Sequence, residues 1–260
     1  MPARMPVVFV SHGAPDALLK APDAVACWRE IGRRLPEPTA ILAVSAHWEA
    51  RHPTLSLSGA PETIHDFAGF APALHRMQYP APGAPALAER AASLIVAAGM
   101  AAELHPGRGL DHGAWVPLSA MYPEANISVA QLSLVRNGSP AGHLALGRAL
   151  APLREEGVLI LASGAITHNF DWLEWQGKAA PLPQASAFAD WVDTRIAAQD
   201  LPDLLDYRSA SLGAEAHPSE EHFLPLFVAL GAAGDDVPAR YQPRFAYGGL
   251  AMDAYVWRRQ

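Results

Sequence analysis

Short apolar runs alternate with longer helical patterns along this chain, and this alternation constrains its fold more than any other feature. The runs that we expect to form strands lie at residues 7–10, 39–45, 127–134 and 158–162. The helical patterns between and after them lie at 23–35, 85–98, 141–156, 185–198 and 220–230. Mostly apolar runs are typical of strands buried on both faces of a parallel sheet. We therefore expect an α/β fold, a single domain over residues 1–260 with a mostly parallel central sheet flanked by helices.

Several residues predict where these elements end. Pro152 should kink or shorten the third helical pattern, because proline cannot donate a helical hydrogen bond. Ser219 is expected to cap the last helix and Gly231 to close it. The segment 250–257 has an alternating pattern, and we expect it to add one edge strand.

The composition excludes several classes of protein. Half of the residues are hydrophobic and 17% are charged, so the chain can bury a large core. The formal net charge is −7 and no Lys/Arg run exceeds two residues, which argues against a nucleic-acid surface. No apolar run approaches the ~20 residues of a membrane span, and the N-terminus lacks the apolar core of a signal peptide. The single cysteine, Cys27, is expected to be a buried small hydrophobe in a reducing compartment. We expect a cytoplasmic protein that binds neither nucleic acid nor membranes.

Histidine is the most informative residue type, with eleven copies in the chain. His12, His47 and His168 each follow a predicted strand in a turn made by small residues. Ligands of open α/β sheets collect outside the carboxyl ends of the strands. One such histidine alone is more often structural, but three at equivalent strand ends favour a shared site.

These positions suggest a metal site, which needs convergent imidazole or carboxylate donors. His12 and His47 are the expected first two ligands, and His222, in the first turn of the last predicted helix, is the best third. Glu220 and Glu221 compete with His222 for this role. Acidic residues in a first turn are, however, ordinarily explained by the helix dipole.

Two further segments are candidates for contact with a substrate. His112 lies in a loop with glycine on both sides. In the same loop, Asp111 either orients an imidazole or caps the next helix. Trp115 is expected to form a wall of the pocket. An aromatic, glycine-punctuated segment is suited to cover an aromatic substrate or is an ordinary surface loop, and its candidate residues are His65, Phe70 and Tyr79. The histidines expected to be surface or loop residues without a role are His52, His75, His105, His143 and His217.

Six motifs occur in a fixed order along the chain: Ser11–Pro15, Ser45–Trp48, Thr63–Phe70, Leu110–Trp115, Ser163–Asn169 and Glu221–Pro225. Together they resemble the class III extradiol ring-cleavage dioxygenases, specifically the 4,5-DOPA dioxygenase-like branch of that superfamily. The resemblance extends from residue 7 to about residue 230, nearly the whole chain.

The resemblance implies an α/β core with one divalent metal ion per chain, Fe(II) or Zn(II), held by His12, His47 and His222. It implies His168 as an acid/base or as a further metal ligand, and His112 as the histidine that contacts substrate or dioxygen. Better-studied members of the superfamily have a glutamate where this chain has His222. A donor set made only of neutral imidazoles suits zinc as well as iron.

The leading hypothesis is therefore an enzyme that cleaves the aromatic ring of a catechol with O₂. His168 is expected to exchange the phenolic proton and His112 to form a hydrogen bond with bound oxygen. A zinc hydrolase on the same scaffold is the second hypothesis. A non-catalytic binding module of the Memo type is the third, and the intact histidine set argues against it. The seven tryptophans leave room for a homodimer.

Overall fold

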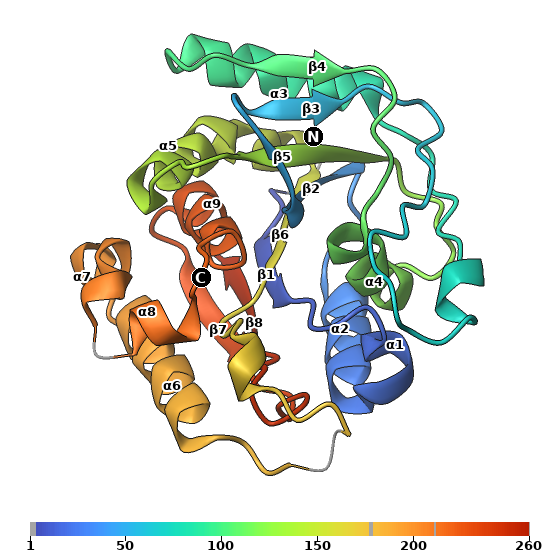
Figure 1. Cartoon of the computed structure of the whole chain (residues 1–260). Helices are drawn as coiled ribbons and strands as arrows, with labels where there is room; N and C mark the ends of the chain where they lie inside the picture. The colour runs from blue at the N-terminus through green and yellow to red at the C-terminus, as the bar shows by residue number, and fades with distance from the viewer. Residues whose placement is uncertain (1–3, 177–178, 211, 260) are drawn as a thin grey trace.

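One continuous sheet organises the computed structural model, which describes residues 4–176, 179–210 and 212–259 (Figure 1). In this part of the chain the sheet has eight strands in the order β4-β3-β5-β2-β6-β1-β8-β7. Their bounds are β1 (Val7–Ser11), β2 (Ala40–Ala50), β3 (Thr54–Ser56), β4 (Glu103–His105), β5 (Val129–Val135), β6 (Val158–Gly164), β7 (Val237–Tyr241) and β8 (Ala254–Arg258). The neighbours β5, β2, β6 and β1 run parallel, as do β3 and β4. The predicted α/β fold with a mostly parallel central sheet is confirmed.

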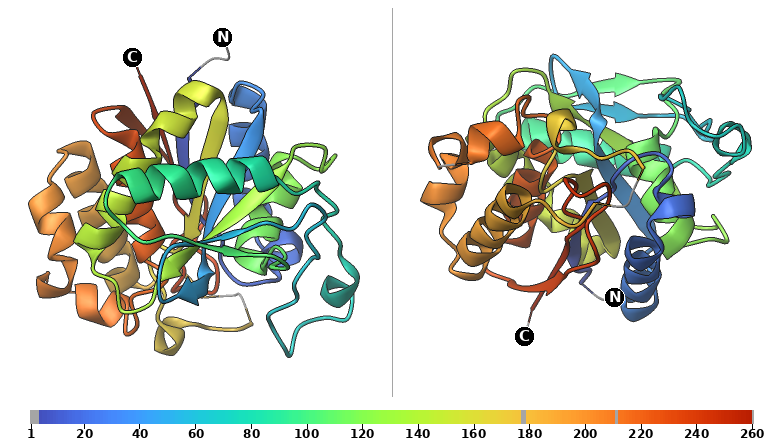
Figure 2. Two further views of the ribbon diagram at one scale, coloured as in Figure 1. Left: turned by 90° about the horizontal axis from the view of Figure 1, so that it is seen from above. Right: turned by 60° about the horizontal axis from the view of Figure 1, so that its bottom comes forward.

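Helices cover both faces of the sheet (Figure 1). Their bounds are α1 (Ala17–Lys20), α2 (Pro22–Arg34), α3 (Pro85–Ala97), α4 (His112–Met121), α5 (Pro140–Leu150), α6 (Pro183–Ala197), α7 (Leu201–Leu205), α8 (Gly213–Ala216) and α9 (Leu224–Ala233). Helices α2 and α4 pack on one face, and α3, α5, α6 and α9 pack on the other. Figure 2 shows α6, α7 and α8 gathered beside α9 on this second side.

The pleat of the central strands explains why their sequences are apolar throughout. Successive residues of a strand point to opposite faces of the sheet. Val8 and Val10 pack with Trp28 of α2, whereas Val7 and Phe9 belong to the core under α9. Because both faces are covered, every position of β1 is buried.

The last long helix differs from the prediction. Helix α9 begins at Leu224, later than expected, and Ser219 does not cap it. Gly231 lies inside the helix, where a Cβ atom would lie 2.1 Å from the carbonyl oxygen of Leu144 in α5. That glycine allows the two helices to approach closely. Helix α9 ends instead at Ala233, and the next residue, Gly234, has a φ of +60°.

The edges of the sheet also differ from the prediction. Strand β8 lies between β1 and β7, so the C-terminal strand is not an edge strand. The edges are β7 and β4, and neither they nor β3 carries a long apolar run that marks a buried strand. The effect of Pro152 is confirmed, because α5 ends at Leu150 and continues only as a 3₁₀ turn over Ala151–Glu156.

Among the described residues, no helix is long and apolar enough to cross a bilayer. Cys27 is half-buried rather than fully buried. Burial, helped by the nearby Asp253 carboxylate, raises the pKa of its thiol to about 12. The thiol is therefore protonated at neutral pH, as expected for a cysteine that acts as a small hydrophobe.

The parallel central strands all end on the same side of the sheet, which we call its carboxyl edge, and this side positions the site. Strand β1 ends at Ser11 and β6 at Gly164, which are paired neighbours. Beside them, the register between β2 and β5 shifts between Val44 and Glu49. A local irregularity of this kind redirects side chains within a strand.

Candidate metal centre

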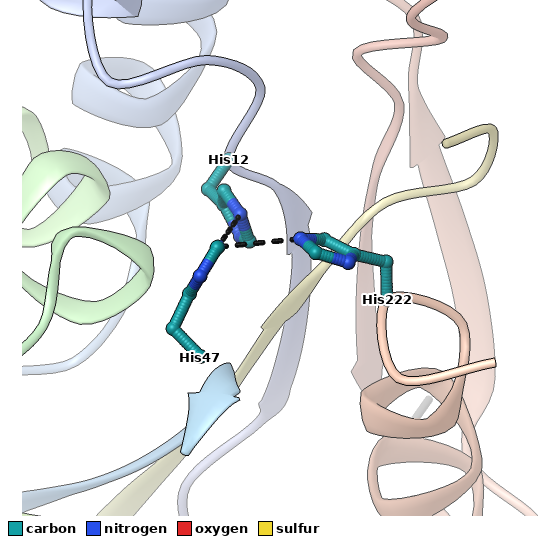
Figure 3. Close-up of side chains that lie close together, drawn as sticks. All are labelled: His12, His47 and His222. Carbon is teal, nitrogen blue, oxygen red and sulfur yellow. Dashed lines mark hydrogen bonds between the residues drawn. The ribbon is translucent and has the colours of Figure 1, made fainter. Parts of the chain in front are cut away.

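Three histidines from distant parts of the sequence converge at the carboxyl edge of the sheet (Figure 3). His12 follows β1 directly, and His47 lies in β2 within the register shift. His222 lies in the turn before α9 rather than in the helix, and its carbonyl oxygen accepts a hydrogen bond from the backbone N–H of Ala165. The His47 Nε2 atom is 3.0 Å from Nε2 of His12 and 3.2 Å from Nε2 of His222.

In each ring the other nitrogen, Nδ1, has a hydrogen-bond partner that determines which nitrogen carries the proton. The hydroxyl of Ser163 donates to the carbonyl of Gly113, so its oxygen accepts from Nδ1–H of His12 at 3.0 Å. The carboxylate of Glu221 accepts from Nδ1–H of His222 at 2.9 Å. With the protons on Nδ1, the Nε2 lone pairs of both rings face the common point.

His47 obtains the same tautomer from a third side chain, the carboxylate of Asp66. Its Nδ1 lies 3.4 Å from Oδ2 of Asp66. Burial acts to raise the pKa of Asp66, but hydrogen bonds from His112 outweigh it and lower that pKa to about 2. The ionised carboxylate favours the proton on Nδ1 of His47, as a metal-ligating histidine requires.

The surroundings keep all three imidazoles neutral. Burial, followed by repulsion from the neighbouring imidazoles, lowers the pKa values of His12 and His222 well below their ordinary range. Burial likewise lowers the pKa of His47 to about 3. Three unprotonated Nε2 atoms this close leave lone pair facing lone pair, an arrangement that a divalent cation relieves. The donor set therefore fits a metal ion.

His112 lies beside this centre as the first residue of α4. Both its backbone N–H and its Nδ1–H donate to Oδ1 of Asp66, at 3.0 and 2.9 Å. Asp111 does not orient a histidine ring; its carboxylate caps α4 at Ala114 N and accepts a hydrogen bond from Ser45. The sequence interpretation missed Asp66 as the group that orients two imidazoles, although it lies inside one of the six motifs.

Close packing at the start of α4 depends on Gly113. A Cβ atom there would lie 2.4 Å from Oγ of Ser45 and 3.1 Å from Cδ2 of His47. Ser45 Oγ also accepts the backbone N–H of His47. The glycine therefore brings the helix against the strand that carries His47.

His168 approaches the centre from the segment after β6. Its ring stacks on that of His222 at 3.4 Å between centroids and 7° between planes. It lies outside the close cluster of His12, His47 and His222. Burial lowers its pKa below the ordinary value, although the Glu221 carboxylate acts in the opposite direction.

A cavity of about 690 Å³ opens in front of the histidines. Its described lining includes His47, His112, His168 and His222, together with Phe67, Phe70, Phe170, Trp175, Asp16, Lys20 and Asp66. Besides His112, Phe70 is the residue predicted to contact a substrate that lies in this described lining. Phe67, from the same aromatic segment, lies beside it with a ring-centroid distance of 5.6 Å.

The other three predicted substrate residues, His65, Tyr79 and Trp115, are not among the described residues that line the cavity. Tyr79 is 2% exposed and its hydroxyl donates to the carbonyl of Tyr122. Trp115 is fully buried, and its indole N–H donates to a backbone carbonyl. His65 is bonded to the carbonyl of Met77 and packs against the Trp115 ring. These side chains support the loop that carries Phe67.

Two of the histidines that were expected to be surface or loop residues are buried. His143 in α5 is 1% exposed and accepts the backbone N–H of Val135. His217 is fully buried and donates to the carbonyl of Ile166, and burial lowers its pKa to about 3. Both hold backbone segments together and do not line the cavity.

The fold and the site together define an α/β protein with a three-histidine, metal-competent centre at the carboxyl edge of a mostly parallel sheet. Residues 5–256 match the family described as the catalytic LigB subunit of aromatic ring-opening dioxygenase. The chain belongs to this family, and the resemblance inferred from the six motifs is confirmed.

Relatives with curated names agree with this assignment. The chain is 39% identical to the 4,5-DOPA dioxygenase extradiol of Escherichia coli K12 over 88% of this chain and 85% of that protein. It is 41% identical to the 4,5-DOPA dioxygenase extradiol of Beta vulgaris over 89% of this chain and 88% of that protein. A crystal structure of an uncharacterized protein from Escherichia coli K12 superposes with a TM-score of 0.81 at 34% identity, covering 98% of this chain and all of that one.

Proposed function

We propose that this protein is a metal-dependent extradiol dioxygenase that opens the aromatic ring of a catechol with O₂. The observation that carries the proposal is the convergence of three Nε2 lone pairs beside a cavity with aromatic walls. Membership of the ring-opening dioxygenase family and the names of the relatives support the reaction class.

His12, His47 and His222 would hold the metal. Fe(II) or Zn(II) bound there would supply Lewis acidity, and iron would also supply redox reactivity toward O₂. The three donors are neutral, so the donor set itself fits either ion. Ser163, Asp66 and Glu221 keep these donors in the tautomer that exposes Nε2.

Two histidines that line the cavity are assigned to the substrate. The lowered pKa of His168 leaves its ring unprotonated at neutral pH, so it accepts the phenolic proton of a catechol and later returns it. His112 is held by two hydrogen bonds to Asp66, which fix its ring for a hydrogen bond to an oxygen of the substrate or of O₂. Phe67 and Phe70 provide apolar surface for the aromatic ring.

The test compares protein loaded anaerobically with Fe(II) and with Zn(II) on a panel of catechols. We expect O₂ uptake matched by the yellow ring-opened product in the iron form and none in the zinc form. Hydrolysis of esters or amides by the zinc form, with no O₂ uptake by either form, would assign the site to a hydrolase instead.

Variants divide the histidines by role. Alanine at His12, His47 or His222 should greatly reduce bound metal, because it leaves two neutral donors. Alanine at His168 should retain most of the metal and lose turnover. His105→Ala is the matched control, since His105 is exposed at the end of β4 and does not line the cavity. Loss of metal in His168→Ala would identify this residue as a fourth ligand.

A further inference from the structure

The cavity is larger than a simple catechol requires. Its volume of about 690 Å³ lies within the range of about 300–1,000 Å³ that is typical of pockets for drug-sized ligands. The wall includes the histidines and also Asp16, Leu19 and Lys20. The site therefore has room for a substituent on the aromatic ring.

Charged groups on the wall are few. Among the described lining residues, Lys20 is the only lysine or arginine, and the carboxylates are Asp16 and Asp66. Asp66 is already bonded to His47 and His112. Among the described lining residues, the charges available to a substituent are therefore those of Asp16 and Lys20.

Asp16 is committed to its protein partners. Its side chain is 4% exposed, and both carboxylate oxygens lie 2.7 Å from the hydroxyl of Tyr247. Its Oδ2 also accepts from the ammonium of Lys20 at 2.9 Å. A carboxylate enclosed in this way positions Lys20 and has little surface left for a cationic ligand.

Lys20 is positioned but not enclosed. Its side chain is 61% exposed, and one of its three N–H donors is directed at Asp16. Its Nζ also lies 5.8 Å from the centre of the Tyr247 ring. The ammonium is thus held from two sides and still has donors for an anion.

The backbone that carries Tyr247 is unusual. Tyr247 has φ +52° and Gly248 has φ +70°, so two successive residues adopt the left-handed region. A non-glycine residue there costs about 1 kcal/mol. The surrounding structure maintains this conformation and with it the hydrogen bond from Tyr247 to Asp16.

Apolar side chains line the cavity between the histidines and Tyr247, since the Phe170 ring lies 5.0 Å from that of His168 and the Trp175 ring 5.2 Å from that of Tyr247. Leu19, Phe170 and Trp175 line it although they are 50%, 64% and 49% exposed. The rings of Phe170 and Trp175 stack at 6.2 Å. Such a wall suits the carbon chain of a substituent whose charged end reaches Lys20.

We propose that Lys20 is a specificity-determining residue that binds a carboxylate on the ring substituent of the substrate. The inference rests on the proposed ring-cleaving function and adds the sign of the charge on the substrate's ring substituent that the cavity favours. An anionic substituent is favoured over a neutral one of the same shape, and an ammonium group is not recognised, because Asp16 is already satisfied.

The test uses three catechols that carry arms of equal length at the 4-position, ending in propanoate, propanamide or propylamine. We expect kcat/KM of the iron-loaded protein to favour the propanoate over the amide by about tenfold, as for one charge-assisted hydrogen bond. Lys20→Met should abolish this preference through KM, and Lys20→Arg should retain it. Arg33→Met is the control for net charge, since Arg33 is exposed on α2 and lies off the cavity wall.

A propanoate preference that persists in Lys20→Met, or is absent from the wild-type protein, would overturn the assignment. Circular dichroism establishes that the variants fold, and Lys20→Gln serves as a second neutral variant. Calorimetric binding of the propanoate and the amide to Zn(II)-loaded protein separates this inference from the reaction itself. A tenfold difference in Kd that Lys20→Met removes supports Lys20 even if no ring is cleaved, and equal Kd values contradict it.

Discussion

The substitution Asp66→Asn examines whether one carboxylate sets the tautomer of a metal-binding histidine. Asp66 accepts two hydrogen bonds from His112 on Oδ1 and faces Nδ1–H of His47 with Oδ2. Asparagine offers only one acceptor oxygen. If that oxygen stays with His112, the amide NH₂ group faces Nδ1 of His47, and two donors oppose each other.

His47 can relieve this clash only by moving its proton to Nε2, the atom that faces His12 and His222. The reverse amide orientation is worse, because the NH₂ group would then face two donors of His112. Loss of a partner that orients a ligand typically costs 10–100-fold in metal affinity. This range corresponds to about 1.4–2.7 kcal/mol.

The assay is a Zn(II) titration against a competing chromogenic chelator, with the exposed Asp171→Asn variant as the control for amide substitution. We expect wild-type affinity in Asp171→Asn and a 10–100-fold weaker Kd in Asp66→Asn. Equal affinity of the folded Asp66→Asn variant and the wild-type protein would refute the tautomer argument.

Three further predictions follow from the packing and titration of the site. Gly113→Ala should destabilise the fold by about 1–3 kcal/mol, because the new Cβ overlaps Ser45 Oγ; an unchanged Tm would contradict this. Burial lowers the pKa values of His47 and His217 to about 3, whereas the pKa of histidine in the unfolded chain is near 6.5. The neutral rings therefore contribute fully to stability above pH 6.5, and this contribution declines as the pH falls towards 3. At pH 5 the free energy of unfolding is lower by about 2 kcal/mol for each histidine. Urea unfolding of the metal-free protein at pH 7 and pH 5 measures this loss, and equal urea midpoints at the two pH values would contradict it. Trp115→Phe should lower the free energy of unfolding by about 1 kcal/mol, because the indole hydrogen bond is lost, and should leave KM for catechols unchanged. A raised KM would indicate that Trp115 contacts the substrate.

The sequence by itself determined the central sheet and the three histidines at its edge. Long apolar runs are local signals, because a strand covered on both faces needs apolar residues at nearly every position. Parallel strands then place their carboxyl ends together, so histidines just after two such runs, His12 and His47, could be assigned to one site before the structure was known. His222 followed from the need for a third donor, although the structure places it in a turn and not in a helix.

The tertiary structure alone decided which groups support these histidines and which residues line the cavity. Asp66 orients His47 and His112 across loops whose course no local pattern specifies. Tyr79 belongs to an aromatic segment whose composition suits either a pocket or a core, and packing against α4 buried it. Strand β8 lies inside the sheet because β7, which lacks a strong apolar pattern, pairs with its outer edge. Contacts of this kind join residues far apart in sequence, and their free energy depends on the packing of the whole chain rather than on any one segment.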